Sequence, residues 1–287
     1  MRPRAVIALL AGALLAPAAL AQTAGEAAPL LPPPITAQST EELKGVNFVS
    51  ACGFSHRLND DPILYPRQPG ASHDHSFVGN RTTHAFSTYT SLRAAATTCH
   101  REGDTAAYWM PTLLVDGMPV RPRGSTVYYR RTTLAPVRPF PAGFRAIAGK
   151  AHAMAPQPRR VTSWNCGPNG GVPPSADVPT CPDDRTNGLR LRVTFGSCWD
   201  GTSLDGPDHQ SHLGYPKAGA CPASHPVPVP AITVIFRYPS AGGPGVTLAS
   251  GGPYSGHADF VNAWHQPTLR GLVANCLNQL RHCARGD

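Results

Sequence analysis

Residues 188–195, GLRLRVTF, alternate apolar and polar side chains along the whole segment. On an extended chain the two leucines, the valine and the phenylalanine would share one face, while two arginines and a threonine would share the other. This alternation predicts a strand of an antiparallel sheet, with one face in the core and one in water. Residues 231–238, AITVIFRY, carry apolar side chains on both faces, which predicts a central strand.

Two further β-type runs lie earlier in the chain. Residues 108–115 and 118–120 are separated by Asp116-Gly117, a dipeptide typical of the type I′ turn of a hairpin. Residues 126–131 form another β-type run. Together with the first two strands, these runs indicate a mainly β protein.

Helix is expected in only two places, because Pro and Gly interrupt most of the chain. Residues 91–98 could form one short helix. Over 269–280 the apolar residues recur with helical spacing, which predicts an amphipathic C-terminal helix packed on a sheet. The expected fold is therefore a β-sandwich or a jelly-roll-like set of antiparallel sheets with a few short helices, stapled by disulfides.

The disulfides are expected from the cysteine count, which is eight and therefore even. None of the cysteines forms a CxxC pair, which argues against a zinc ribbon or a thioredoxin-type motif. Many pairings are possible, but short loops are the easiest to close. We therefore expect sequential pairing: Cys52–Cys99, Cys166–Cys181, Cys198–Cys221 and Cys276–Cys283.

The N-terminus has the pattern of an export signal. Arg2 and Arg4 precede an apolar run over 5–20, which ends in a small-x-small site. We expect a signal peptide over 1–21 and a secreted protein, extracellular or periplasmic, with no membrane span after cleavage. The run is short for a membrane anchor, which is the weaker interpretation.

The remaining chain divides into a linker and one domain. Residues 22–42 are rich in Ala and Pro, which favours a disordered linker. One globular domain is expected over 43–287, and we expect it to be monomeric.

The net charge is +8, yet no dense basic run interleaves with aromatic residues. A nucleic-acid partner is therefore not expected. The mild positive charge would suit an anionic glycan or another envelope polymer, although it could equally serve solubility.

The chain has twelve histidines, and many of them fall in three clusters with aspartates. The first cluster comprises 52–62 and, close behind it, 72–80, which contains the HxH pair His73 and His75. The second spans 198–212, and the third spans 254–265. Each cluster lies in Gly/Pro/Ser-rich sequence near an expected strand end, where a rigid scaffold commonly presents functional groups. We therefore expect the three clusters to form one cleft.

Two chemistries fit these clusters. Paired aspartates could supply the acid and the base or nucleophile of glycosidic cleavage, with histidines as bases or orienting groups. The catalytic candidates are Asp60, Asp61, His73, His75, Asp208, His209, His212, His257 and Asp259. Candidates for binding the substrate are His56, Asn80, Tyr108, Trp109, Trp199, Asp200, His225, Asn262 and Trp264.

The second chemistry is metal binding. No cofactor is required by the first interpretation, but a Zn or Cu ion could be held by histidines, with aspartates beside them. The alternative ligands are His73, His75, His209, His212 and His257. Any single aspartate could instead form a turn. No serine-hydrolase elbow, phosphate loop, dinucleotide glycine motif or HExxH sequence is present.

Several strings of the chain resemble a known secreted family. They include CGFSHRLNDDPILYPRQPGASHDHSFVGN from residue 52, FGSCWDGTSLDGPDHQSHLGYP from residue 195 and YSGHADFVNAWHQ from residue 254. The family is catalogued as "domain of unknown function nineteen ninety-six", and the resemblance covers roughly residues 46–283. Its members are fungal and bacterial exoproteins, some of which also carry cell-wall or carbohydrate-binding modules. The resemblance implies work on extracellular polysaccharide and assigns no catalytic residue.

The expected function is therefore a secreted carbohydrate-active enzyme, a glycan hydrolase or lyase acting on an extracellular or cell-wall polysaccharide. Two alternatives stay open. One is a non-catalytic envelope or glycan-binding protein, and the other is a metal-dependent exoenzyme that uses the histidine clusters.

Overall fold

A computed structural model of the chain describes Met1 and residues 31–168 and 172–284. The expected signal peptide and the first part of the expected linker, residues 22–30, lie outside the described residues. The chain is 33% strand and 8% helix, with several antiparallel sheets and four disulfides. The mainly β fold class is therefore confirmed.

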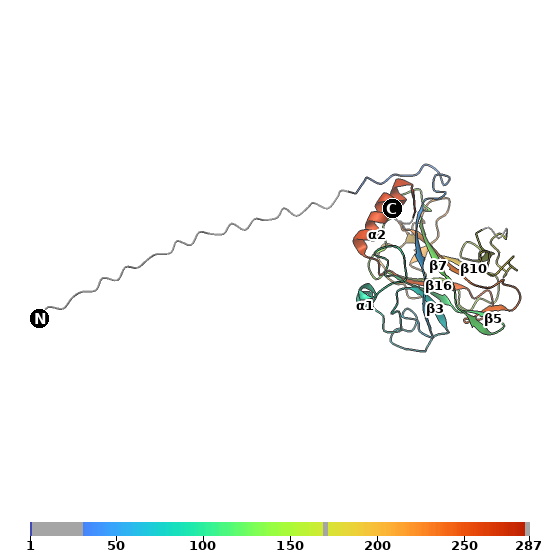
Figure 1. Cartoon of the computed structure of the whole chain (residues 1–287). Helices are drawn as coiled ribbons and strands as arrows, with labels where there is room; N and C mark the ends of the chain where they lie inside the picture. Colours follow the sequence, from blue (N-terminus) through green and yellow to red (C-terminus); the bar gives the residue numbers. More distant parts are fainter. Residues whose placement is uncertain (2–30, 169–171, 285–287) are drawn as a thin grey trace. The chain divides into compact units, whose positions relative to one another are not determined.

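Two large sheets form the body of the domain (Figure 1). The strand order of the six-stranded sheet is β17 (His282–Cys283), β1 (Asn47–Cys52), β7 (Gly124–Arg130), β14 (Ala231–Arg237), β10 (Leu189–Thr194) and β9 (Thr162–Cys166). The strand order of the five-stranded sheet is β2 (Phe54–Leu58), β3 (His75–Gly79), β4 (Ala107–Pro111), β16 (His257–Val261) and β8 (Arg145–Gly149). Both sheets are antiparallel except where β17 runs parallel to β1.

Two three-stranded sheets and two short helices complete the described chain. One small sheet contains β12 (Leu213–Gly214), β11 (Cys198–Trp199) and β13 (Val227–Pro228), and the other contains β15 (Val246–Leu248), β5 (Leu113–Val115) and β6 (Met118–Val120). The helices are α1 (Tyr89–Ala94) and α2 (Gln266–Asn275), the latter followed by the 3₁₀ turn η1 (Leu277–Gln279). No helix among the described residues is long and apolar enough to cross a membrane.

Most strands follow the sequence patterns, but the expected run over 108–115 is divided between β4 and β5, which belong to different sheets. Along β10 the side chains alternate between buried and half-buried, with the leucines and the valine inside. Strand β14 pairs with β7 on one side and β10 on the other, so the run with two apolar faces is central. In the β5–β6 hairpin, Asp116 and Gly117 have φ angles of 50° and 77°, the left-handed pair that a type I′ turn requires.

The helices confirm the sequence patterns with shifted ends. Helix α1 starts two residues earlier than expected, because the Thr88 hydroxyl accepts the Ser91 N–H at 3.2 Å and caps it. It also ends at Ala94 rather than continuing to residue 98. The C-terminal helix buries Leu269, Leu272 and Val273.

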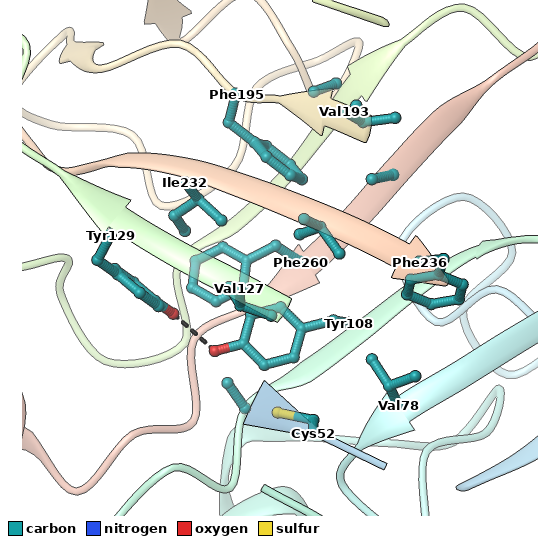
Figure 2. Close-up of a cluster of buried hydrophobic side chains, with 14 of the residues drawn as sticks. Cys52, Val78, Tyr108, Val127, Tyr129, Val193, Phe195, Ile232, Phe236 and Phe260 are labelled. Carbon is teal, nitrogen blue, oxygen red and sulfur yellow. Dashed lines mark hydrogen bonds between the residues drawn. The ribbon is translucent and has the colours of Figure 1, made fainter. Parts of the chain in front are cut away.

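The two large sheets pack face to face through one aromatic and aliphatic core (Figure 2). The Phe260 ring of β16 lies 5.4 Å from that of Tyr108 on β4 and 6.3 Å from that of Phe195, which follows β10. The hydroxyls of Tyr108 and Tyr129 from opposite sheets are 2.7 Å apart. Phe260 therefore fixes β16 against the other sheet.

The cysteines pair as expected from loop closure. The bridges are Cys52–Cys99, Cys166–Cys181, Cys198–Cys221 and Cys276–Cys283.

The expected linker does not extend over residues 35–37. The Ile35 N–H donates to the Asn278 carbonyl, the Ala37 N–H donates to the Leu134 carbonyl, and Ala37 is buried. The Arg131 guanidinium also donates to the Ile35 carbonyl at 2.7 Å. The Pro/Ala-rich composition could not show that carbonyls of the domain accept hydrogen bonds from the backbone of these residues.

Replacing Phe260 with Ala should lower the free energy of unfolding by about 3–5 kcal/mol, because a large cavity would open between the two sheets. Urea unfolding followed by circular dichroism measures this loss. Phe86→Ala is the matched control, since Phe86 is 54% exposed and its removal should change stability by no more than about 0.5 kcal/mol. Equal losses in the two variants would contradict the assigned core.

Candidate functional site

The outer face of the five-stranded sheet carries a buried group of histidines and aspartates. On β16, Phe260 points into the core, so the alternation of the strand sends His257 and Asp259 to the opposite face. Trp109 of β4 pairs with Asp259, and β3 begins with His75. The loop over 59–74 precedes β3 and supplies further polar groups to this face.

Three imidazoles meet there. The ring centroids of His73 and His75 are 4.2 Å apart, and the His257 ring lies 5.1 Å from the first and 5.7 Å from the second. One nitrogen from each ring lies within 4.8 Å of the other two. The HxH pair from the first cluster and a histidine from the third therefore converge, although about 180 residues separate them in the sequence.

Backbone carbonyls fix the protonation of two of these rings. His75 Nδ1 lies 3.1 Å from the Asp60 carbonyl oxygen, and His257 Nδ1 lies 2.9 Å from that of Ser255. Because a carbonyl oxygen only accepts, each Nδ1 carries the proton and each Nε2 keeps a lone pair. The Nε2 atoms of His73, His75 and His257 are all buried without a hydrogen-bond partner.

Burial keeps these imidazoles neutral. Desolvation, followed by the neighbouring His152, lowers the pKa of His73 to about 4. Desolvation also lowers the pKa of His257 to about 3, against a rise from its bond to Ser255. For His75 desolvation, then His73 and His257, lowers the pKa well below its ordinary value. At neutral pH the three rings therefore present lone pairs rather than charge.

Two carboxyls lie beside the rings. Asp259 is fully buried, neither of its oxygens has a hydrogen-bond partner, and Oδ2 lies 3.9 Å from His257 Nε2. Desolvation, and then the nearby Asp61, raise the pKa of Asp259 well above its ordinary value. One oxygen of Asp61, one of Asp259 and one nitrogen of His75 lie within 4.8 Å of one another.

Asp61 is partly satisfied by its own loop. Its Oδ1 accepts the Ile63 and Leu64 N–H groups at 2.8 and 2.9 Å, while Oδ2 has no partner. Desolvation raises the pKa of Asp61, and the two N–H groups, the Trp109 indole and His209 act against that rise. Trp109 Nε1 is close enough to act on the carboxyl but makes no hydrogen bond.

Such a group of unpartnered lone pairs is costly to bury, because buried polar atoms are normally hydrogen-bonded. A cation would satisfy them together. Imidazole nitrogens with carboxylate oxygens suit Zn²⁺ and Cu²⁺, and metal-bound histidines commonly donate their other N–H to a carbonyl or carboxylate. His73, His75 and His257 are therefore the residues that could hold a metal, with Asp61 and Asp259 beside them.

A hollow of about 470 Å³ leads to this group. Its lining includes His257, Tyr65, His152 and Asp208. The hollow therefore adjoins the second cluster through Asp208 and the third through His257. His152 was missed from the sequence, since it stands alone in KAHA with no acid or second histidine beside it.

The second cluster borders the site without joining the imidazoles. His209 Nδ1 is 2.8 Å from Asp205, and its φ of 59° is rare for a residue with a side chain. Asp208 accepts the Ser211 and Gln210 N–H groups, and these bonds, led by that of Ser211, lower its pKa to about 2. His212 is buried against Phe144 and donates to the Arg145 carbonyl.

His212, an expected ligand, is not among the histidines whose nitrogens converge; its Nε2–H donates to a backbone carbonyl, and its Nδ1 is buried without a partner. Asp60, an expected catalytic residue, has a structural role in this fold. Its two oxygens accept the Gly70 and Ala85 N–H groups at 2.8 and 2.9 Å. These bonds hold in place the loop over 59–74, which covers the histidine group and is called the covering loop below.

Several expected substrate-binding residues are structural. Tyr108 and Trp264 are fully buried between the sheets, where the Trp264 indole donates to the Tyr129 hydroxyl at 2.9 Å. Asn80 and Asn262 are also buried, and each amide donates to two backbone carbonyls. The structure therefore gives these four side chains structural contacts away from the histidine group.

The remaining four lie away from the imidazoles and serve local structure. His56 stacks on Phe77 at 4.7 Å and hydrogen-bonds the Thr83 carbonyl. The Trp199 indole donates to the Ser203 carbonyl, and Asp200 accepts N–H groups of the same turn. His225 hydrogen-bonds the Ser211 carbonyl. Of the nine expected substrate-binding residues, Trp109 alone contacts the buried group.

A comparison with protein families places this site within a recognised domain. The model of the family described as Domain of unknown function (DUF1996) matches residues 61–264. The chain belongs to this family. The matched segment contains Asp61, His73, His75, His257 and Asp259, so the whole buried group lies within the family domain. No curated protein and no solved structure matches the chain.

Replacing His257 with Asn should flatten the pH dependence of stability of chelator-treated protein between pH 6.5 and 4. The folded pKa of His257, about 3, lies below its ordinary value of 6.5, so over this interval the unfolded chain binds a proton that the folded chain excludes. Wild type should therefore lose stability as the pH falls, by up to about 1.4 kcal/mol per pH unit for this group.

Urea unfolding at a series of pH values measures the slope, and Asn keeps a donor for the Ser255 carbonyl. His282→Asn is the control, because it removes an exposed imidazole. A His257→Asn slope equal to that of wild type would contradict the buried, neutral state of this ring.

Proposed function

We propose that this protein is a zinc-dependent hydrolase that acts on acyl groups of an extracellular glycan. One observation carries the proposal. Three neutral imidazoles each bring a nitrogen within 4.8 Å of the other two, their Nε2 atoms have no partner, and backbone carbonyls hold two of the rings through Nδ1. Three protein ligands with a further position for water or substrate are the usual arrangement of catalytic zinc.

The same geometry disfavours glycosidic cleavage by a pair of aspartates. That chemistry needs two carboxyls flanking a sugar in a cleft, about 5–9.5 Å apart. Asp61 and Asp259 instead lie side by side, each with an oxygen within 4.8 Å of the other. The carboxyls of Asp60 and Asp208 accept hydrogen bonds from backbone N–H groups. The metal-dependent alternative therefore fits better than the glycosidase expected from sequence.

Each residue has a role in this proposal. His73, His75 and His257 hold the metal, which when bound activates water and polarises a carbonyl. The carboxylate of Asp259 takes the proton of the attacking water. Burial raises its pKa well above the ordinary value in the metal-free protein, and a bound cation would favour the charged form that accepts a proton. Water oxygen bonds to the acyl carbon, the bond to the sugar oxygen or nitrogen breaks, and the proton passes to that leaving atom.

The substrate and the location rest on other support. The hollow beside His257 is open enough for a substituent of a polymer, and the resemblance to exoproteins with cell-wall modules favours a glycan. We also propose export. All eight cysteines form disulfides, and such bonds persist in oxidising compartments.

One prediction of this proposal concerns the metal content of the protein. Protein purified without a metal-affinity tag should retain about one zinc per chain, measured by mass spectrometry of the elements. His73→Asn, His75→Asn and His257→Asn should each weaken zinc binding by more than about 100-fold, because loss of a ligand should exceed the loss from an outer partner.

His225→Asn is the matched control, since this ring lies outside the buried group. Its zinc content should equal that of wild type. Retention of zinc by all three ligand variants would remove the proposed centre, and copper in place of zinc would redirect the proposal toward oxidative chemistry.

Another prediction of this proposal concerns enzymatic activity. Wild type should release acetate from acetylated xylan or N-acetylated chito-oligosaccharides, lose that activity with a chelator and regain it with Zn²⁺. Asp259→Asn should retain zinc while kcat falls by about 10²–10⁴-fold, because the proton acceptor is gone. Acetate release that neither the chelator nor Asp259→Asn reduces would contradict the proposed mechanism.

A further inference from the structure

The outer face of the six-stranded sheet carries arginines from three neighbouring strands. Arg190 and Arg192 of β10 share this face with Arg237 of β14 and Arg130 of β7. The register pairs Arg190 with Arg237. This surface is the opposite side of the sandwich from the histidine group, because each group occupies the outer face of a different sheet.

These guanidinium groups are close enough to repel one another. Desolvation, and then Arg192, lower the pKa of Arg130, while desolvation and then Arg237 lower that of Arg190. Among the described residues, no ion pair joins Arg130, Arg190 or Arg192 to a carboxylate. A bound anion would relieve the repulsion that the sheet imposes on them.

Two neighbouring hollows extend this positive surface at the end of the sheet. The smaller, of about 310 Å³, is lined by Arg123, Arg185, Arg190 and Arg237 among others. The larger, of about 830 Å³, shares Arg123 and adds Arg81, Arg121 and His100. Of the described residues that line either hollow, none is Asp or Glu.

Two acids, Asp183 and Asp184, precede Arg185 in the chain, and the first is committed to its own loop. The Asp183 carboxyl accepts the backbone N–H groups of Asn187 and Arg185 at 2.9 and 2.8 Å. The neighbouring Asp184 contributes its carbonyl oxygen, which accepts from the Arg123 guanidinium at 2.9 Å. Backbone contacts of this kind orient Arg123 without neutralising it.

We propose that this arginine surface binds a polysaccharide that carries carboxylate or sulfate groups. Guanidinium groups form paired hydrogen bonds with such oxyanions, and a row of them suits a polymer with regularly spaced charges. The two hollows have the volume of typical ligand sites. None of their lining residues borders the hollow beside His257, so this binding is independent of the proposed zinc chemistry.

The aromatic residues favour a polysaccharide over a nucleic acid. The Arg121 guanidinium covers the Phe54 ring at 4.8 Å, and that of Arg130 covers the Tyr128 ring at 4.2 Å. Proteins that bind single strands expose such rings so that bases can stack on them. Here each ring has a guanidinium over one face. That face holds the arginine by a cation–π contact and is not open for a base to stack on.

The test is isothermal titration of the full chain with polygalacturonate and, separately, with chondroitin sulfate at low salt. Neutral dextran should not bind. Arg123→Gln/Arg185→Gln, both exposed positions, should weaken polyanion binding at least about tenfold, since a hydrogen bond to a charged group contributes that much. Arg190→Gln/Arg192→Gln should give a similar loss, and added salt should weaken wild-type binding.

Arg138→Gln/Arg270→Gln is the matched control, because it removes the same charge at exposed positions outside both hollows. It should bind polyanion within about twofold of wild type. Circular dichroism reports whether each variant is folded. Equal losses in the control, no polyanion binding at low salt, or tighter binding of single-stranded DNA than of either polysaccharide would overturn the proposal.

Discussion

The placement of Phe260 in the core constrains the whole candidate site. Its ring packs on Tyr108 and Phe195 between the two sheets, which fixes the register of β16 against β4 and β8. Because side chains alternate along a strand, that choice forces Asp259 and His257 to the outer face. A slip of one residue would exchange the core phenylalanine for a carboxylate. Hydrophobic packing on one face therefore determines the polar geometry on the other.

The covering loop contributes two aspartates, Asp60 and Asp61, to the candidate site. Asp60 binds two distant backbone N–H groups, which holds the loop over the sheet, and its own carbonyl orients His75. The neighbouring Asp61 instead leaves one oxygen free among the imidazoles. Burial beneath this loop lowers the pKa of the histidines and raises those of the aspartates. The same desolvation that makes the group costly to bury would strengthen its hold on a cation.

The two outer faces of the sandwich have opposite electrostatic character. One places neutral imidazoles and two carboxyls under a loop, whereas the other presents arginines that repel one another. Both sheets pack on the core between them, and disulfides at the strand ends fix the loops around it. A polymer held along the arginines and chemistry at the histidines would use separate surfaces, so each can be altered by substitution without disturbing the other.

Local patterns determined much of the fold. Alternation identified β10, two apolar faces identified β14 as central, and loop length was sufficient to pair the cysteines, because these features depend on neighbours in the chain. The sequence also singled out His73, His75, His257 and Asp259. Only the tertiary structure decided that these meet, that Asp60 is structural while Asp61 is not, that Trp264 is buried, and that the isolated His152 borders the hollow. Register and burial join residues far apart in the chain, and no local spacing encodes which of twelve histidines will face one another.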